Sequence, residues 1–424
     1  MDIDKYVPYR LGTAKLAPLP NKWKSLEGSL PPKVQEARAI AIEYLKDEPI
    51  AMLYIRHRGE ERNTVLILSS YAPALENKWR KAIEKLYECF KHKEGLIAEI
   101  VDYHVYNAPL PKSITTAEVD LHQVVALFDD HEWMTVDVLR WYSPVRQEDW
   151  PTVVITARDA GKDSWWSEKI PVVEQFLKDQ GLDLEVVLWF LDQLLPGLSS
   201  DEQDEHNLLL VEDGRKFGVT ACRNFRQRPG STQAGLIGLS IQSPSSYDNR
   251  LLKKWLSEDL KAEDFHISNL GKISTVSSSG SWLTDWCLFE LPPRKCIFMV
   301  PESWARVEDG KTYQVKKQGR STGLREGTIS ASPSIINSKY IKHAQDAGTI
   351  TSARCIVSKD MPFCLPGDYG ASVQENNSGT ILGLCVAYNE ATKVSYMTPI
   401  ATIVGEINDA VASKIKEPKE TQLE

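Results

Sequence analysis

The chain has 424 residues, of which 42% are hydrophobic and 25% charged, values typical of a folded globular protein. A formal net charge of −8 disfavours a broadly basic nucleic-acid-binding surface but leaves room for a local basic cleft. The length predicts about two or three domains.

Targeting and redox signals are weak. The first residues include acidic side chains and lack the apolar segment of a secretory signal, and no apolar run approaches the ~20 residues of a membrane span. The seven cysteines lack the spacing of a zinc site or of a disulfide framework. We therefore expect a cytoplasmic protein with reduced thiols, no metal, no cofactor and no membrane contact.

After an N-terminal extension, residues 1–30, the first half of the chain alternates predicted helices and strands. Apolar residues recur at helical spacing in residues 32–47, 77–91 and 165–178. The strand-like runs are residues 50–55, 64–68, 96–103, 134–141, 152–156 and 184–190. Residues 65–86 and 152–176 share one plan, a β-run followed by a polar loop, a tryptophan and an aliphatic helix face. We predict one α/β domain, residues 31–198, formed by internal duplication.

The second half has a different pattern, which begins after the acidic stretch 199–206, a predicted linker. Short β-runs are separated by Gly, Ser, Asp and Asn, which is typical of a barrel or a sandwich. These runs are residues 207–211, 217–220, 234–241, 286–290, 380–387 and 394–398. A helix is expected at residues 399–415, and the composition of the tail 416–424 predicts disorder.

Four segments of this half carry recognisable motifs: FGVTACRNF at 217–225, TDWCLFEL at 284–291, KKQGRSTGLREGTIS at 316–330 and LPGDYGASV at 365–373. In this order they resemble the trypsin-like serine peptidases, in particular a divergent fungal and bacterial branch. The resemblance covers residues 207–415. It implies an all-β, trypsin-like double β-barrel that follows the α/β domain.

The resemblance also implies that the catalytic triad is degenerate. Asp285 matches the acidic member, but the histidine position falls on Arg223 or Asn224. Neither side chain exchanges a proton near neutral pH. The serine position holds Tyr369, whose phenol is a poor acyl acceptor without a base beside it. Serine-protease activity is therefore not expected.

Other parts of the family's site are retained. The glycine turn at Gly367, with the backbone of Tyr369, implies a preserved oxyanion pocket. Asp368, Arg320 and Ser321 are the candidate substrate-binding residues. Tyr369 either serves as an acid or base or fills the vacated cleft, and both interpretations remain open. Cys364 is interpreted as a buried structural thiol.

Two functions are compatible with these residues. The first is a pseudoprotease, an intracellular module that binds a peptide or protein ligand in the former protease cleft. The second is an enzyme repurposed for acyl transfer, such as a fungal cyclodipeptide synthase that uses aminoacyl-tRNA and favours arginine. This second function needs basic residues for tRNA, among them Arg223, Lys317 and Arg320, and an acidic pocket at Asp285 and Asp368. The sequence leaves open whether the protein is an enzyme.

Overall fold

The computed structural model describes residues 10–14, 19, 23–26, 31–46, 49–57, 63–92, 95–107, 110–115, 119–196, 208–212, 215–220, 240–243, 268–276, 287–290, 304–319, 321–340, 350–359, 361–365, 368 and 370–411. The chain divides into two compact units. Unit 1 comprises Met1–Lys112, Gln123–Trp133 and Leu139–Asp192. Unit 2 comprises Ser113–His122, Met134–Val138 and Gln193–Glu424.

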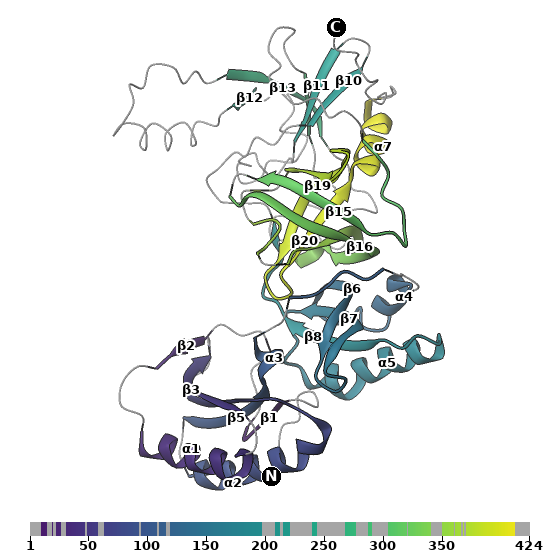
Figure 1. Ribbon diagram of the computed structural model, residues 1–424. Helices are drawn as coiled ribbons and strands as arrows, with labels where there is room; N and C mark the ends of the chain where they lie inside the picture. The colour runs from purple at the N-terminus through teal and green to yellow at the C-terminus, as the bar shows by residue number, and fades with distance from the viewer. Residues whose placement is uncertain are drawn as a thin grey trace, which may run out of the picture. The chain divides into compact units, whose positions relative to one another are not determined.

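The first layer of unit 1 is a five-stranded sheet in the order β1-β5-β4-β3-β2. Strands β3 and β4 are antiparallel, whereas β4 and β5 are parallel. The strands are β1 (Arg10–Gly12), β2 (Trp23–Ser25), β3 (Ile50–His57), β4 (Asn63–Ser69) and β5 (Leu96–Asp102). Two helices, α1 (Pro32–Leu45) and α2 (Glu76–Phe90), lie side by side on one face of this sheet (Figure 1).

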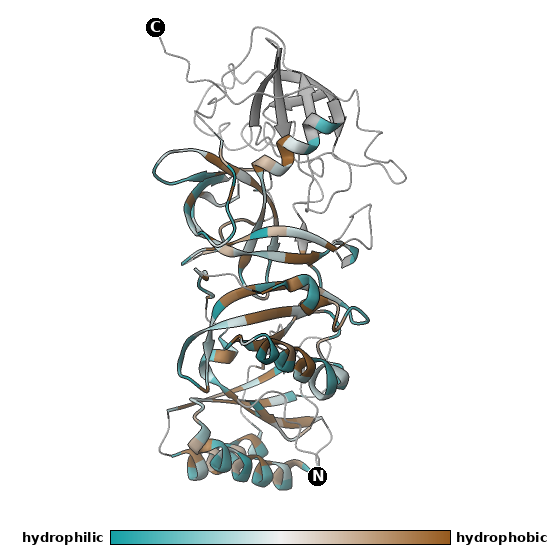
Figure 2. Cartoon of the chain, turned by 90° about the vertical axis from the view of Figure 1, so that its right-hand side faces the viewer, coloured by the Kyte–Doolittle hydropathy of each residue, from teal (hydrophilic) through white to brown (hydrophobic). Residues whose placement is uncertain are grey.

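Helix α2 shows why this layer forms. It buries Trp79, Ala82, Ile83, Leu86 and Phe90, which recur every three or four residues and so share one face. The strands opposite supply apolar side chains such as those of Val65 and Ile67, which are fully buried. Figure 2 shows the same division, with hydrophobic residues along the strands and hydrophilic residues on the outer sides of the helices.

Strands β6 (Trp133–Ser143), β7 (Glu148–Ala157) and β8 (Glu185–Phe190) are hydrogen-bonded neighbours at one end of a ten-stranded sheet. Residues Met134–Val138 of β6 belong to unit 2, whereas β7 and β8 belong to unit 1. Strands β7 and β8 are parallel. A π-helical turn, η2 (Trp165–Lys169), leads into α5 (Ile170–Asp179) between them. The chain order β6-β7-α5-β8 thus repeats the order β3-β4-α2-β5 of the first sheet. Two short helices, α3 (Tyr103–Tyr106) and α4 (Leu121–Val125), complete this part of the chain.

Unit 2 contains a closed ring of six antiparallel strands in the order β15-β18-β19-β20-β17-β16, closed by pairing of β15 with β16. The strands are β15 (Tyr313–Gly319), β16 (Gly323–Asn337), β17 (Ile350–Val357), β18 (Ser372–Glu375), β19 (Ile381–Asn389) and β20 (Val394–Pro399). Its interior includes Val315, Ile329, Phe363 and Met397, all fully buried. The ring is a small barrel filled by side chains.

Three further features of unit 2 adjoin this barrel. Strand β16 continues past the ring, and its Ile335 and Ile336 pair with Val136 and Thr135 of β6. The short strand β9 (Leu195–Pro196) pairs with β19. Helix α7 (Ile400–Val411) follows β20 directly.

A second, five-stranded sheet of unit 2 has the order β10-β11-β14-β13-β12. Its strands are β10 (Leu208–Glu212), β11 (Arg215–Thr220), β12 (Ser240–Ser243), β13 (Ser268–Val276) and β14 (Cys287–Glu290). All of its neighbouring strands are antiparallel.

The sequence-predicted helices at residues 32–47 and 77–91 are confirmed as α1, which ends two residues earlier, and α2, which is shifted by one residue. The helix expected at 165–178 begins instead with the π-helical turn. The expectation of reduced thiols differs from the structure, in which Cys364 and Cys385 form a disulfide. These two cysteines are 21 residues apart, so no short spacing motif announces the pair. No helix in the described ranges is both long and apolar enough to cross a bilayer.

Candidate functional site

The candidate site of unit 2 lies where the loop after β17 meets the turn between β15 and β16. Of the predicted site residues, the structure describes Asp368 and Ser321 and brings them together, since the Ser321 N–H donates to Asp368 Oδ1 at 2.6 Å. The other predicted residues lie outside the described ranges: Arg223, Asn224, Asp285, Arg320, Gly367 and Tyr369. Their roles remain predictions.

Asp368 is the centre of a fully buried polar network. Lys317 Nζ lies 2.9 Å from Asp368 Oδ2, and neither side chain is exposed to solvent. The Thr322 hydroxyl donates to Oδ2 at 2.7 Å and accepts a hydrogen bond from Lys317 Nζ at 2.6 Å. The backbone N–H groups of Thr322 and Leu365 donate to the same carboxylate at 3.2 and 3.1 Å. Both carboxylate oxygens are therefore fully used within the protein.

Strand geometry explains how a lysine reaches this interior. Along β15, Tyr313, Val315, Lys317 and Gly319 are buried while the residues between them are more exposed, as side chains alternate across a strand. A buried ammonium group is stable only beside an opposite charge. A Cβ atom on Gly319 would overlap Lys317 Nζ and the Asp368 carboxylate, so only glycine leaves space for the pair.

The network fixes the ionisation of Asp368. Burial alone raises the pKa of this carboxyl, but the hydrogen bond from Thr322 and the ion pair with Lys317 lower it below the ordinary value. Asp368 is therefore a carboxylate at neutral pH, held in place by donors from two separate loops.

Further bonds hold the loop around Asp368 against the barrel. The Ala371 N–H donates to the Asp368 carbonyl at 3.1 Å, and the Gly370 N–H donates to the Cys385 carbonyl at 2.8 Å. Gly370 has φ +83°, a conformation that glycine adopts without strain. The disulfide between Cys364 and Cys385 ties the start of this loop to β19. Asp368 and Gly370 are thus each held by hydrogen bonds of their own.

These contacts bear on the roles that the sequence suggested. Asp368, a candidate for holding an arginine side chain, is already bound to Lys317. Lys317, a candidate for contacting tRNA, is 1% exposed and cannot reach an external phosphate as placed. The pair therefore acts as a structural brace in this conformation. The inward position of Lys317 in the strand alternation is the sequence signal that would have identified it.

A second buried polar cluster lies in unit 2 around Asp137, a fully buried residue of β6. The Tyr396 hydroxyl donates to Asp137 Oδ2 at 2.8 Å, and the Thr135 hydroxyl contacts the same oxygen at 3.4 Å. The Ser334 hydroxyl also interacts with the Asp137 carboxylate and lowers its pKa, but by less than burial raises it. Burial raises the pKa of Asp137 to about 6. Sequence analysis missed this residue because an isolated aspartate in a β-run gives no motif.

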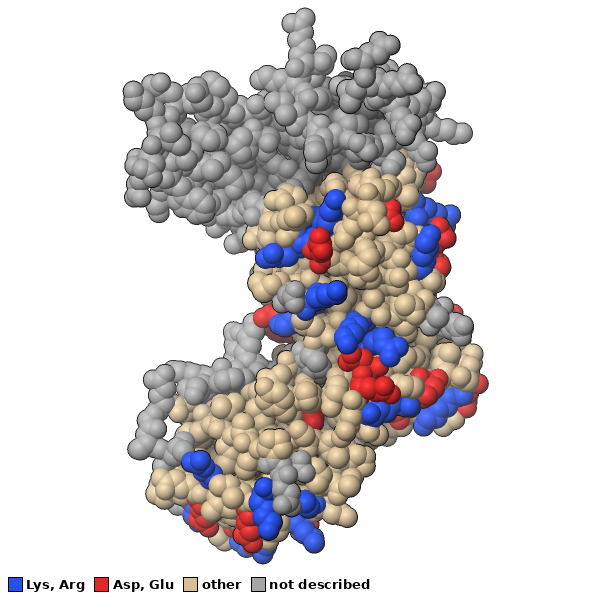
Figure 3. Space-filling model, in the orientation of Figure 1, with Lys and Arg blue, Asp and Glu red and all other residues tan. Residues whose placement is uncertain are grey.

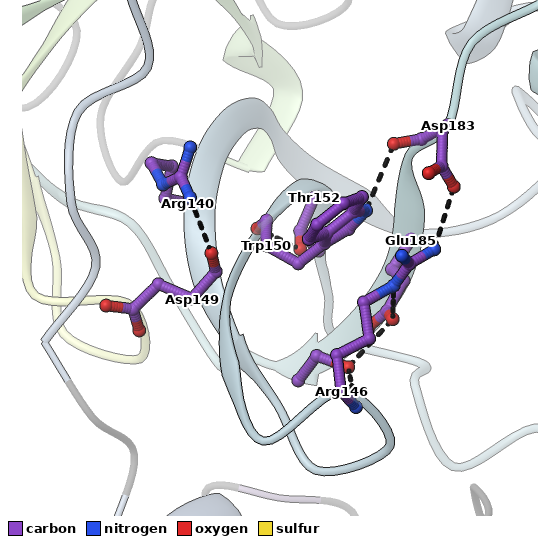
Figure 4. Close-up of polar contacts among 8 residues, drawn as sticks. Arg140, Arg146, Asp149, Trp150, Thr152, Asp183 and Glu185 are labelled. Carbon is purple, nitrogen blue, oxygen red and sulfur yellow. Dashed lines mark hydrogen bonds and ion pairs between the residues drawn. The ribbon is translucent and has the colours of Figure 1, made fainter.

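A surface cluster in unit 1 joins the β6–β7 turn to the start of β8 (Figure 4). The guanidinium carbon of Arg146 lies 3.6 Å from the centroid of the Trp150 ring. Arg146 also donates to Asp183 at 2.8 Å and to Glu185 at 3.3 Å, and Trp150 Nε1 donates to the Asp183 carbonyl at 3.1 Å. These contacts tie Arg146 to groups of its own unit, so the cluster braces the hairpin.

Both signs of charge occur on one face of the described residues. On the face of the described residues shown in Figure 3, basic and acidic side chains lie interspersed. A nucleic-acid-binding surface instead gathers Lys and Arg on one face. Within the described ranges, no group of three or more His, Cys, Asp or Glu residues is arranged to hold a metal ion.

Comparisons with known proteins find similarity only among solved structures. No protein-family model and no curated protein matches it. One similar solved structure is a glutamic acid specific serine protease, with 13% identity and a TM-score of 0.30 over 49% of this chain and 90% of that one. Protease A of Thermobifida fusca is 11% identical, with a TM-score of 0.31, and the match covers 53% of this chain and 98% of that one. The MamO protease domain from Magnetospirillum magneticum is 12% identical, with a TM-score of 0.28, and the match covers 45% of this chain and 81% of that one. These neighbours are serine proteases of the trypsin fold.

Proposed function

We propose that unit 2 is a trypsin-like module that has lost peptide cleavage and binds a peptide or protein partner in the former protease cleft. The observation that carries the proposal is the fate of the nucleophile loop. Its sequence places Tyr369 where the resembling peptidases have serine, and the adjacent Asp368 is committed to a buried brace with Lys317. The loop is thus retained as a framework without the group that performs the chemistry.

The closed ring of β15–β20 supports the same proposal. A barrel with a filled core is a rigid support, and binding residues act best from loops that such a support positions. The resemblance extends the assignment to residues 207–415, with the five-stranded sheet β10–β14 as the other barrel of a trypsin-like pair. We also propose that the repeated order β-β-α-β in unit 1 reflects an internal duplication.

The proposal is tested with the purified full-length chain and a degenerate library of synthetic peptides. We expect mass spectrometry to find every peptide intact after incubation, and equilibrium binding to enrich a subset. Tyr369→Asp should weaken binding of that subset by roughly tenfold or more, because it places an unpaired charge in the proposed binding cleft. Ser378→Asp, which adds the same charge at an exposed position of unit 2, is the matched control.

Two results would contradict the proposal. One is peptide cleavage that disappears in Tyr369→Phe, which would make the phenol a catalytic group. The other is a small cyclic arginine-containing peptide in extracts of expressing cells that is lost in Asp285→Ala. That result would establish acyl transfer from an activated aminoacyl donor instead of binding.

A further inference from the structure

Unit 1 contains a serine, a histidine and an aspartate in relay order, far in sequence from the degenerate triad of unit 2. His131 Nδ1 lies 2.9 Å from Asp159 Oδ2, and His131 Nε2 lies 3.3 Å from the Ser164 hydroxyl oxygen. The three residues come from the turn before β6 and from the loop between β7 and η2. This is the hydrogen-bond order in which an acid orients a base and the base activates a nucleophile.

The aspartate is held as an ionised acceptor. Burial alone raises the pKa of Asp159, but hydrogen bonds from Trp165 and Lys162 lower it below the ordinary value. Trp165 Nε1 donates to Oδ1 at 3.0 Å, the Glu132 N–H donates to the same oxygen at 3.2 Å, and Lys162 Nζ lies 3.0 Å from Oδ2. A carboxylate fixed by three donors is a rigid partner for the imidazole.

The carboxylate in turn determines the histidine tautomer. The Asp159 carboxylate can only accept a hydrogen bond, so the neutral ring carries its proton on Nδ1 and donates it to Asp159. The Nε2 lone pair is then presented to Ser164. The ring is 5% exposed, and its centroid lies 4.4 Å from that of the fully buried Trp165. The imidazole is thus held in one orientation, with its acceptor atom directed at the hydroxyl.

Ser164 occupies a position suited to chemistry. It lies beyond the carboxyl end of β7, which runs parallel to β8, and ligands of α/β sheets bind at such ends. The π-helical turn Trp165–Lys169 follows it immediately, and turns of this kind are frequent at functional sites. Ser164 is half-buried between the exposed Asp163 and the buried Trp165.

We propose that Ser164 is the nucleophile of a second site in this protein and accepts acyl groups from small carboxylic esters. His131 is its base, and Asp159 is a positioning residue. The Ser164 oxygen attacks the ester carbonyl while its proton passes to His131 Nε2. The bond to the alcohol then breaks, and the alcohol leaves with that proton. Water then attacks the acyl-serine carbonyl and gives a proton to His131, which returns it to the Ser164 oxygen as the acid is released.

The test uses a fluorophosphonate, because its reaction is irreversible and leaves a defined mass. The serine oxygen displaces fluoride at phosphorus, and the proton of the hydroxyl is taken up by His131. We expect one adduct on the intact full-length chain. Tryptic digestion and fragmentation of the peptide 163–169 should place it on Ser164 rather than on Ser167.

Variants separate a reactive serine from a structural one. Ser164→Ala removes one oxygen, keeps the bond between Asp159 and His131, and should abolish the adduct with an unchanged melting temperature. Ser167→Ala is the matched control on the same turn, where its hydroxyl donates to the Asp163 carbonyl, and should label like the wild type. His131→Asn should slow labelling by about 100-fold or more, the contribution of a general base.

Turnover is measured with p-nitrophenyl acetate, for which wild type and Ser167→Ala should release nitrophenol and Ser164→Ala should not. An unlabelled wild type, or equal labelling rates in wild type and Ser164→Ala, would overturn the proposal. An adduct mapped to a serine of unit 2 would also overturn it, and would contradict the binding function proposed for that unit as well. An unlabelled wild type would overturn this proposal alone and leave the binding function proposed for unit 2 standing, so the two failures can be told apart.

Discussion

Replacement of Asp137 by asparagine is the sharpest test of the energetics of unit 2. The side chain is fully buried in β6, and Tyr396 donates to one of its oxygens at 2.8 Å. Burial also raises the pKa of Tyr396 well above its ordinary value, so this tyrosine remains a donor throughout the accessible pH range. Asparagine keeps an oxygen for that hydrogen bond but removes the ionisation.

The expected effect depends on pH in a defined direction. Burial raises the pKa of Asp137 to about 6, whereas an exposed aspartate has 3.8. The unfolded chain gives up this proton at a lower pH than the folded protein. The contribution of protonated Asp137 to the free energy of unfolding is therefore fully present below about pH 4 and is lost as the pH rises through about 6. A difference of about two pKa units at ~1.4 kcal/mol each amounts to about 3 kcal/mol. The amide of the Asp137→Asn variant does not titrate and avoids this loss.

The assay is amide hydrogen exchange in β20, which carries Tyr396 and reports opening of the barrel. Variant and wild type are compared at the same pH, so the intrinsic exchange rate cancels. Between pH 4 and pH 7, protection in Asp137→Asn should rise relative to wild type by up to roughly 100-fold, the equivalent of about 3 kcal/mol. Asp409→Asn, an exposed carboxylate on α7, is the control with the same charge change.

The cost of burying the new amide group does not depend on pH. It lowers the free energy of unfolding of the variant by the same amount at pH 4 and at pH 7, and so does not affect this comparison. A protection ratio that stays the same at pH 4 and pH 7 would refute the reasoning, since it would mean that Asp137 does not titrate differently in the folded and unfolded states. A ratio that falls with pH would indicate a carboxylate stabilised by its surroundings.

Three further substitutions test the other clusters. Asp368→Asn leaves Lys317 buried without its counter-ion and should lower the free energy of unfolding of unit 2 by about 3–5 kcal/mol at pH 7, measured with denaturant. This loss should shrink in acid, below the lowered pKa of Asp368, where the wild-type carboxylate is also protonated. Equal stability of variant and wild type at pH 7 would rule out the brace. Gly319→Ala should lower the melting temperature of unit 2, because a Cβ atom overlaps the ion pair; Gly405→Ala, where a Cβ meets nothing, should not. Arg146→Ala should cost unit 1 only about 1 kcal/mol, as for a partly exposed stacked cation; a loss of several kcal/mol would show that the cluster does more than brace the hairpin.

Elements with a regular apolar period could be predicted from the sequence, and elements filled with small polar residues could not. Helix α2 has apolar residues every three or four positions, and every residue of β19 is buried, so both stand out. Strand β16 places Ser330, Ser332 and Ser334 in the interior of unit 2, where their small side chains fit a crowded barrel. The residue types of such a strand are those typical of a loop, so composition alone does not predict it.

The same limit applies to the candidate sites. The resemblance to peptidases pointed to Asp368 and Ser321, which are 47 residues apart in sequence and bonded in the structure. The resemblance did not reveal the counter-ion Lys317, for which the alternation of buried and exposed residues along β15 is the signal. The contact of His131 with Ser164 joins residues 33 apart and follows from tertiary structure alone.

The division of β6 has a consequence for how this protein could be shortened or inherited in pieces. Residues Met134–Val138 belong to unit 2, where Thr135 and Val136 pair with the end of β16 and Thr135 also accepts from Asn389. A chain that started at the acidic stretch 199–206 would leave that edge of β16 uncovered, and uncovered edges promote aggregation. A fragment that begins at residue 199 is therefore expected to aggregate more readily than the full-length chain.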